Sequence, residues 1–144
     1  MVKKEWENMK SYTDLEQSKK LAEILPIESA DGFWEYHDKW RSEGDECEGY
    51  EDYPRAEPYL EYTRKKNEWK EDKSDVPCWS LAALLDVLPD EVGDNYYLTL
   101  DKEGKEYCCC YEDNNGNSFR HCFSDNPVDA CYKMVLKLHE QKLL

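Results

Sequence analysis

Residues 96–123 place the strongest constraint on the fold of this chain. They contain three runs that favour β-strands, each with aromatic residues, separated by the dipeptides Glu103-Gly104 and Asn115-Gly116. Such dipeptides are typical of tight turns that join antiparallel strands. The segment therefore predicts a three-stranded antiparallel meander, in which neighbouring side chains on a strand point to opposite faces.

Helices are predicted on both sides of the meander. After Pro77, four leucines recur at the spacing i, i+3, i+4 and i+7, which makes one apolar stripe of a short helix that Pro89 ends. Beyond the meander, Asn126 can cap a helix whose first position is Pro127. The leucines of the first stripe are Leu81, Leu84, Leu85 and Leu88.

The N-terminal half resembles the C-terminal half in its order of elements. A shift of 63 residues aligns 21–39 with 84–102, and both segments contain a helical pattern, a Leu-Pro pair, an acidic loop and an aromatic strand. Two interpretations stay open: an internal duplication with units 13–73 and 74–144, or chance similarity in a biased composition. Either way we expect one α+β domain, 1–144, with antiparallel hairpins or a meander packed against about three helices.

The charge argues against two classes of partner. The chain has 33 acidic and 19 basic residues and a formal charge of −14, which disfavours attraction to nucleic-acid phosphates or anionic lipid. No apolar run is long enough for a signal peptide or a membrane span, so we expect a soluble cytoplasmic protein. Seven irregularly spaced cysteines indicate free thiols in a reducing compartment.

The cysteine triplet at 108–110 is divided between the two faces of the predicted meander. With Asn115-Gly116 at the turn, Tyr111 lies opposite Arg120, and Cys110 lies opposite His121. We expect the more apolar face to pack against the helices. That face would carry Tyr96, Leu98, Leu100, Tyr107, Cys109, Tyr111 and Cys122.

The opposite face contains the candidate metal ligands Cys108, Cys110 and His121, which lie on one side of adjacent strands. Two thiols and an imidazole are soft ligands suited to zinc. Structural zinc sites usually draw thiolates from C-x-x-C motifs and have four ligands, and no fourth ligand has a recognisable spacing. The sequence therefore favours half-buried thiols beside aromatic rings, with no metal and no cofactor. This face would carry Tyr97, Thr99, Cys108, Cys110, Phe119, His121 and Phe123.

Catalysis is not expected. Cys78 is the one thiol near a predicted helix start, where its pKa would be lowered, but no partner base is identifiable. Phosphate-binding loops and hydrolase motifs are absent from the sequence, and pairs of carboxylates carry no information in a chain this acidic.

The favoured function is a non-catalytic interaction module. If the face with Tyr97, Phe119, His121 and Phe123 is uncovered, it would form a contact with an unknown protein partner or the seam of a homodimer. The competing interpretation is that the N-terminal hairpin covers it.

An alternative function uses the acidic segment 42–58, which is predicted to be a long exposed loop. An acidic protein can imitate nucleic acid and occupy a basic groove on a DNA-handling or defence protein. A second alternative is a thiol- or zinc-binding module. The acidic residues that would carry the mimicry are Glu43, Asp45, Glu46, Glu48, Glu51 and Asp52.

Two stretches, VPCWSLAALLDVLP at 76–89 and SDNPVDACYKMVLKLHEQKLL at 124–144, carry a resemblance. Their pattern, W-S-L-x-x-L-L-x-x-L-P followed by D-N-x-x-D-A-C, resembles small acidic proteins of prophages and other mobile elements of gut bacteria. The resemblance implies an accessory protein in a bacterial cytoplasm and implies no activity.

Overall fold

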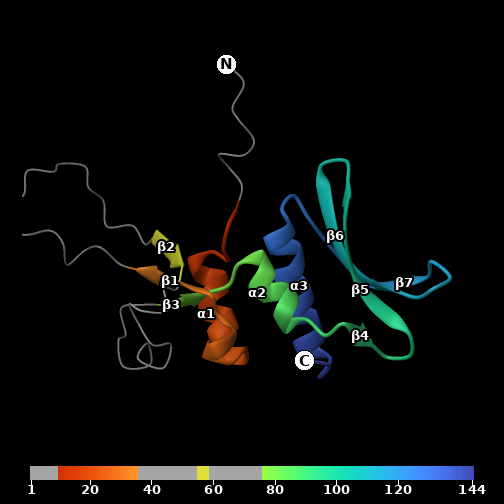
Figure 1. Ribbon diagram of the computed structural model, residues 1–144, viewed down its shortest axis with the longest axis horizontal. Coiled ribbons are helices and arrows are strands. Elements are labelled where there is room, and N and C mark those ends of the chain that lie inside the picture. Colours follow the sequence, from red (N-terminus) through yellow and green to blue (C-terminus); the bar gives the residue numbers. More distant parts are fainter. Residues whose placement is uncertain (1–9, 36–54, 59–75) are drawn as a thin grey trace, which may run out of the picture. The chain divides into compact units, whose positions relative to one another are not determined.

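The computed structural model describes residues 10–35, 55–58 and 76–144 (Figure 1). The chain divides into two compact units, one formed by residues 14–79 and the other by residues 1–13 and 80–144. Each unit combines helices with an antiparallel sheet, so the predicted α+β class is confirmed.

The unit of residues 14–79 contains α1 (Leu15–Ile24), the short 3-10 helix η2 (Ile27–Ser29) and a three-stranded sheet in the order β2-β1-β3. Its strands are β1 (Gly32–Glu35), β2 (Arg55–Pro58) and β3 (Val76–Cys78). The side chain of Asp14 accepts a hydrogen bond from the backbone of Gln17, and the side chain of Gln17 accepts one from the backbone of Asp14, so a capping box starts α1. Trp79 is fully buried, and its indole donates to Ser29 Oγ at 2.9 Å.

Two sequence predictions fall within this unit. The prediction of a loop over 42–58 is wrong at its end, because 55–58 form β2. β2 is an edge strand of the sheet, the kind of strand in which a proline such as Pro58 is tolerated. The partner strand predicted within 59–69 lies outside the described residues, and β1 instead pairs with β2 and β3. The internal duplication stays a prediction.

The other unit contains α2 (Leu81–Val87), the strands β4 (Glu91–Val92), β5 (Tyr96–Glu103), β6 (Glu106–Glu112) and β7 (Ser118–Ser124), and α3 (Pro127–Glu140). The sheet order is β4-β5-β6-β7, and every neighbouring pair is antiparallel, as the meander prediction requires. Both predicted helices are confirmed. Ser80 caps α2, and Asn126 Oδ1 caps α3 by accepting from the amide of Asp129 at 2.8 Å.

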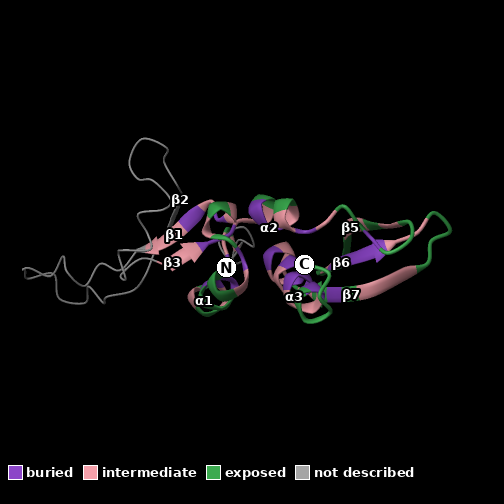
Figure 2. Ribbon diagram, turned by 90° about the horizontal axis from the view of Figure 1, so that it is seen from below, coloured by how far each residue is buried: buried purple, intermediate pink, exposed green. Residues whose placement is uncertain are grey.

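The core of this unit lies between α3 and the inner face of the sheet, where α3 packs on β6 and β7 (Figure 2). Cys109 and Tyr111 of β6 are fully buried, as are Met134 and Leu138 of α3. The hydroxyl of Tyr111 donates to the carbonyl of Pro89 at 2.8 Å. The prediction that Cys109 and Cys122 act as small core residues on this face is confirmed.

The register of the first hairpin differs from the prediction without changing the faces. Glu103 pairs with Glu106, so Gly104 and Lys105 form the turn in place of Glu103 and Gly104. Gly104 has a φ of +62°, a conformation that glycine adopts at little cost. Because the pairing moves by an even number of positions, each side chain stays on its predicted face.

The second hairpin contains a β-bulge that the sequence analysis missed. Cys109 pairs with Cys122 as expected, but Tyr111 pairs with Phe119, and the predicted pairing of Tyr111 with Arg120 is wrong. The register changes between Cys109 and Tyr111, so β7 has an extra residue there. Arg120 has a φ of +59°, which is rare for a residue with a Cβ.

The cause of the bulge lies in the turn that precedes β7. Asp113 Oδ1 accepts hydrogen bonds from the amides of Asn115 and Asn117, at 2.9 and 2.8 Å, and the Asp113 amide donates to the Asn117 carbonyl. These bonds form a longer connection than a two-residue Asn-Gly turn, and Glu112 then pairs with Ser118.

The bulge exchanges the faces of two side chains. Phe119 lies beside Tyr96, with ring centroids 4.5 Å apart, on the inner side that carries Tyr111, so its predicted position on the opposite face is wrong. Ser118 takes its place opposite Glu112. We call the side of the sheet away from α3 the outer face. It carries Tyr97, Thr99, Asp101, Cys108, Cys110, Glu112, Ser118, His121 and Phe123.

We predict that Tyr111→Phe lowers the free energy of unfolding by about 1 kcal/mol, because the hydrogen bond from the buried Tyr111 side chain to the carbonyl of Pro89 is lost. Tyr97→Phe is the matched control, since Tyr97 lies on β5 of the same sheet with 42% of its surface exposed, and it should change stability by less than about 0.5 kcal/mol. Urea unfolding measures both variants. Equal losses would contradict the role given to the Tyr111 hydroxyl.

Candidate metal centre

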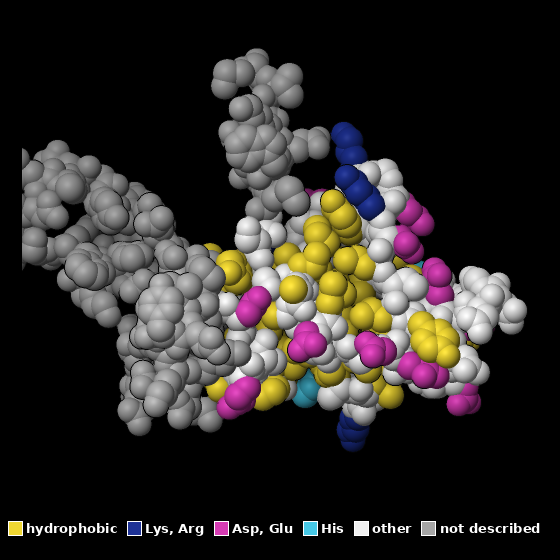
Figure 3. Space-filling view, in the orientation of Figure 1, with side chains coloured by type: hydrophobic (Ala, Val, Ile, Leu, Met, Phe, Trp, Pro, Cys, Tyr) yellow, Lys and Arg dark blue, Asp and Glu magenta, His cyan; other side chains and the backbone are white. Residues whose placement is uncertain are grey.

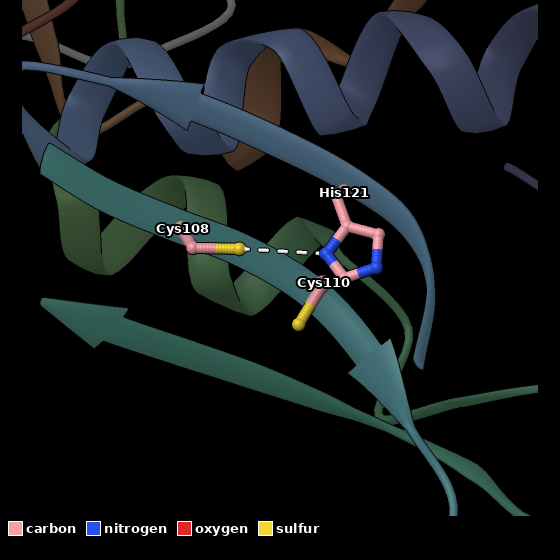
Figure 4. Close-up of side chains that lie close together, drawn as sticks. All are labelled: Cys108, Cys110 and His121. Atoms are coloured by element: carbon pink, nitrogen blue, oxygen red, sulfur yellow. Dashed lines mark hydrogen bonds between the residues drawn. The ribbon is translucent and has the colours of Figure 1, made fainter. Parts of the chain in front are cut away.

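Three side chains of kinds that can bind metal ions lie close together on the outer face (Figure 4). Cys108 and Cys110 alternate with Cys109 along β6, and His121 lies on the neighbouring strand β7. The donor atoms of Cys108, Cys110 and His121 all lie within 4.8 Å of one another. Cys108 Sγ and His121 Nδ1, joined by the dashed line in Figure 4, are 3.8 Å apart. The predicted juxtaposition of these three residues is therefore confirmed.

Two neighbours hold the imidazole ring of His121 in place. Its Nε2 is 2.9 Å from the hydroxyl of Ser118, and its ring stacks on that of Phe123 with centroids 5.8 Å apart. With the Nε2 proton donated to Ser118 Oγ, Nδ1 has a free lone pair directed at Cys108 Sγ. Ser118 reaches this position because the bulge at Arg120 moves it to the outer face.

The thiol of Cys110 has two polar neighbours. Thr99 Oγ1, across the ladder on β5, lies 3.1 Å from Cys110 Sγ. The thiol also donates toward Glu112 Oε1, 3.8 Å away on the same face of β6. The hydroxyl of Thr99 can donate its proton to a thiolate. The carboxylate of Glu112 can only accept, so it can bond the neutral thiol but not the thiolate.

The surroundings keep both thiols protonated at neutral pH. Burial raises the pKa of Cys108 to about 12, and the nearby Cys110, Glu103 and Asp101 add to this effect. Burial also raises the pKa of Cys110, with further contributions from Glu112 and Asp101, although hydrogen bonds from Thr99 and Cys108 oppose the rise. Neither thiol has the electropositive setting of a reactive cysteine, so a redox or nucleophilic role is not favoured.

The acidic groups around the cluster favour a bound cation. Asp101 pairs with Cys108 in the ladder, and Glu112 follows Cys110 on the same face. Acidic side chains are also spread over the part of the meander visible in Figure 3. The field of these carboxylates raises the local concentration of cations and opposes loss of the thiol protons unless a cation replaces them.

The remaining described cysteines lack the features of a site. On the inner face, Cys109 and Cys131 are hydrogen-bonded to each other, and this bond raises the pKa of Cys109 and lowers that of Cys131. Cys78, the thiol weighed for catalysis, is fully buried in the other unit, and burial together with Asp31 raises its pKa. A buried thiol with a raised pKa is the opposite of an activated nucleophile.

The structure describes part of the predicted interaction surface. Tyr97 and Phe123 are exposed over 42% and 44% of their surfaces, and His121 is exposed as well. Phe119 lies on the inner side, as described above. The acidic residues proposed for nucleic-acid mimicry all lie outside the described residues: Glu43, Asp45, Glu46, Glu48, Glu51 and Asp52.

Sequence reasoning missed two residues of this site, Ser118 and Glu112. Both are placed by the pairing of Glu112 with Ser118, which follows from the enlarged turn at Asp113. An Asp two residues before an Asn is a signal for such a turn, and it competes here with the signal of Asn115-Gly116.

Comparison with family models, with curated proteins and with solved structures found no match to this chain. Among the described residues, no helix combines the length and the apolar character needed to cross a membrane.

The pKa shifts predict that the metal-free, reduced protein loses stability as the pH rises above about 8.5, the usual pKa of an unfolded thiol. Burial raises the pKa of Cys108, Cys110 and Cys122 in the folded state, so above this pH the folded protein holds more protons than the unfolded chain. The loss should continue up to about pH 12, the pKa of Cys108. The lowered pKa of Cys131 opposes the trend.

Urea unfolding at pH 8 and pH 10, with a chelator and a reductant, measures this loss. Cys108→Ser removes one titrating group, so its stability should fall less between the two values than that of the wild type. Equal stability of the wild type at both values would contradict the assignment of buried, protonated thiols.

Proposed function

We propose that this protein binds a soft divalent metal ion, zinc above all, at Cys108, Cys110 and His121. The observation that carries the proposal is the mutual approach of the three donor atoms within 4.8 Å. In tetrahedral zinc sites, with bonds of about 2.3 Å to sulfur and about 2.0–2.1 Å to nitrogen, the ligand atoms lie about 3.6–3.8 Å apart. The separation of 3.8 Å between Cys108 Sγ and His121 Nδ1 needs little rearrangement to meet this geometry.

The donor set selects among metals. Two thiolates and one imidazole suit zinc and other thiophilic ions, whereas calcium and magnesium require oxygen ligands. The raised pKa values of Cys108 and Cys110 do not prevent binding, because the metal ion replaces the two protons.

The second shell supports the same function. Metal-bound histidines generally donate their other ring N–H to an oxygen atom, which fixes the ring and its tautomer. Ser118 provides such an oxygen 2.9 Å from His121 Nε2. Thr99 provides a hydroxyl 3.1 Å from Cys110 Sγ, where it can donate to a thiolate.

The proposed setting is a bacterial cytoplasm, where thiols remain reduced and available to a metal. The resemblance to accessory proteins of prophages and mobile elements supports this setting. The same outer face supports a second candidate function, contact with a protein partner or a second copy of the chain, because the rings of Tyr97 and Phe123 are exposed. Nucleic-acid mimicry by the segment 42–58 stays a prediction.

We predict that the reduced protein binds one Co²⁺ or Zn²⁺ ion, and that Co²⁺ produces the near-ultraviolet charge-transfer band of a thiolate complex. Cys108→Ser, Cys110→Ser and His121→Ala should each weaken binding by about 100-fold or more, since even changes to second-shell residues cost 10–100-fold. Titration against a chromogenic chelator measures the affinity.

Two variants serve as controls for this prediction. His139→Ala removes an exposed histidine of α3, and Cys122→Ala removes a thiol of the inner face; both should keep the wild-type affinity. A wild-type protein that shows no charge-transfer band, or controls that lose the metal as readily as the ligand variants, would refute the proposed function.

We further predict that Ser118→Ala weakens metal binding by about 10–100-fold while leaving the thiolate band in place, because the histidine loses the acceptor that fixes its ring. Ser124→Ala is the matched control at the other end of β7, where the hydroxyl bonds Asp125. The same titration compares the two variants. Wild-type affinity in Ser118→Ala would show that Ser118 does not position His121.

A further inference from the structure

We infer that the metal ion keeps an open coordination position on the outer face, and that a histidine of a basic protein partner occupies it. This inference rests on the metal binding proposed above. It defines the partner by its chemistry, an uncharged imidazole with cationic side chains on either side. The ion would then join the two proteins directly.

The described part of the chain supplies three ligands to the ion. The donor atoms of Cys108, Cys110 and His121 lie within 4.8 Å of one another, and no other described histidine, cysteine or carboxylate belongs to this cluster. Zinc held by three protein ligands binds water or another external molecule in its fourth position. The fourth position at this site is therefore available to a ligand from outside the described residues.

This fourth position would face solvent. Cys108 and Cys110 are buried in β6, whereas His121 is exposed on β7, which is an edge strand of the sheet. In Figure 4 the imidazole of His121 lies beside the two cysteine side chains. With the thiolates beneath it and the imidazole beside it, the ion would present its remaining side to the outside of the sheet.

The charge of the outer face selects the external ligand. Two thiolates cancel the charge of a divalent ion, and an uncharged imidazole adds none. The ladder positions of β5 and β6 on this face include no Lys or Arg, but they include four acids, Asp101, Glu103, Glu106 and Glu112. An anionic fourth ligand would place a further negative charge among these carboxylates, whereas a second imidazole would not.

Two exposed aromatic rings next to the cluster add a preference for cations. Phe123 pairs with Cys108 in the ladder. Tyr97 lies two residues before Thr99, whose hydroxyl is 3.1 Å from Cys110 Sγ. Both rings are exposed, and the faces of aromatic rings attract the side chains of Arg and Lys. Cationic residues on either side of a bound histidine would therefore meet both rings and carboxylates.

A second copy of the chain fits this face less well than a basic partner. Each copy has a formal charge of −14, so two such faces would repel each other. A basic segment has the opposite charge, and complementary charges speed association and disfavour other partners. The partner we propose is therefore a basic protein segment with an accessible histidine.

The experiment titrates the full-length Co²⁺-loaded protein with capped peptides and follows its visible absorption bands. The peptides are Arg-Arg-His-Arg-Arg, Arg-Arg-Ala-Arg-Arg and Glu-Glu-His-Glu-Glu. The first should change the visible bands while the thiolate band remains, and at low salt it should bind about tenfold or more tightly than the acidic peptide. The peptide without histidine should leave the bands unchanged. Free imidazole should produce the same change at a higher concentration, because it forms the bond without the added charges.

Variants of the outer face separate the bond to the ion from the surroundings. Tyr97→Ala and Asp101→Asn should each weaken binding of the basic histidine peptide by about two- to fivefold and leave the affinity for free imidazole unchanged. Asp86→Asn is the matched control, since it removes an exposed acid of α2, and it should bind both ligands like the wild type. Far-ultraviolet circular dichroism checks that each variant is folded.

The outcomes distinguish this inference from the proposed function. If imidazole and the basic histidine peptide both leave the Co²⁺ bands unchanged, the position is not open, and the inference is overturned while metal binding stands. Equal binding of the basic and acidic histidine peptides would also overturn it, as would loss of the thiolate band when the peptide removes the ion. If the wild-type protein binds no Co²⁺, both proposals are overturned.

Discussion

The alternation of side chains along β6 is the constraint on which the rest of the unit depends. β6 has a strand on each side, so its backbone groups are paired and its side chains must serve two faces. Residues 108–111 are all buried, which a strand exposed to solvent on one face would not show. Cys109 and Tyr111 fill the space beneath α3, and Cys108 and Cys110 lie under the side chains of the outer face. The cysteine triplet thus performs two separate tasks in three consecutive residues.

The sequence predicts this division of the cysteines between two faces because the alternation of side chains along a strand does not depend on the exact position of a turn. The first hairpin turn lies one residue further along than predicted, and the pairing changes by two positions, yet no side chain changes face. The same alternation predicts that Cys108, Cys110 and His121 lie on one side of the sheet. In the structure their donor atoms lie within 4.8 Å of one another. The helices α2 and α3 could also be predicted from the sequence, because the leucine spacing of α2 and the Asn126-Pro127 start of α3 are local signals.

The bulge in β7 could not be predicted from the sequence in the same way. The signal of Asn115-Gly116 competes with the carboxylate of Asp113, which captures two backbone amides and enlarges the connection. An odd change in register reverses the faces of every residue between the turn and the bulge, and Phe119 and Ser118 are the residues affected. The sequence offered no fourth ligand at a recognisable spacing, and in the described part of the chain the cluster consists of three donors from two neighbouring strands.

The conformation of Arg120 connects this irregularity to the proposed metal site. A left-handed conformation costs a residue with a Cβ about 1–2 kcal/mol, and such outliers persist where the surroundings compensate for them. Here the guanidinium group lies 4.3 Å above the ring of Phe119, and its Nη1 donates to the side chain of Gln141 at the end of α3. These contacts stabilise the bulge from the inner side, while its benefit lies on the outer face, where Ser118 meets His121. A metal ion bound there would favour the same backbone, because any ligand that binds the folded state alone stabilises it. The strained residue and its compensating contacts thus lie next to the proposed site, and metal binding there would give the bulge a reason that packing alone does not.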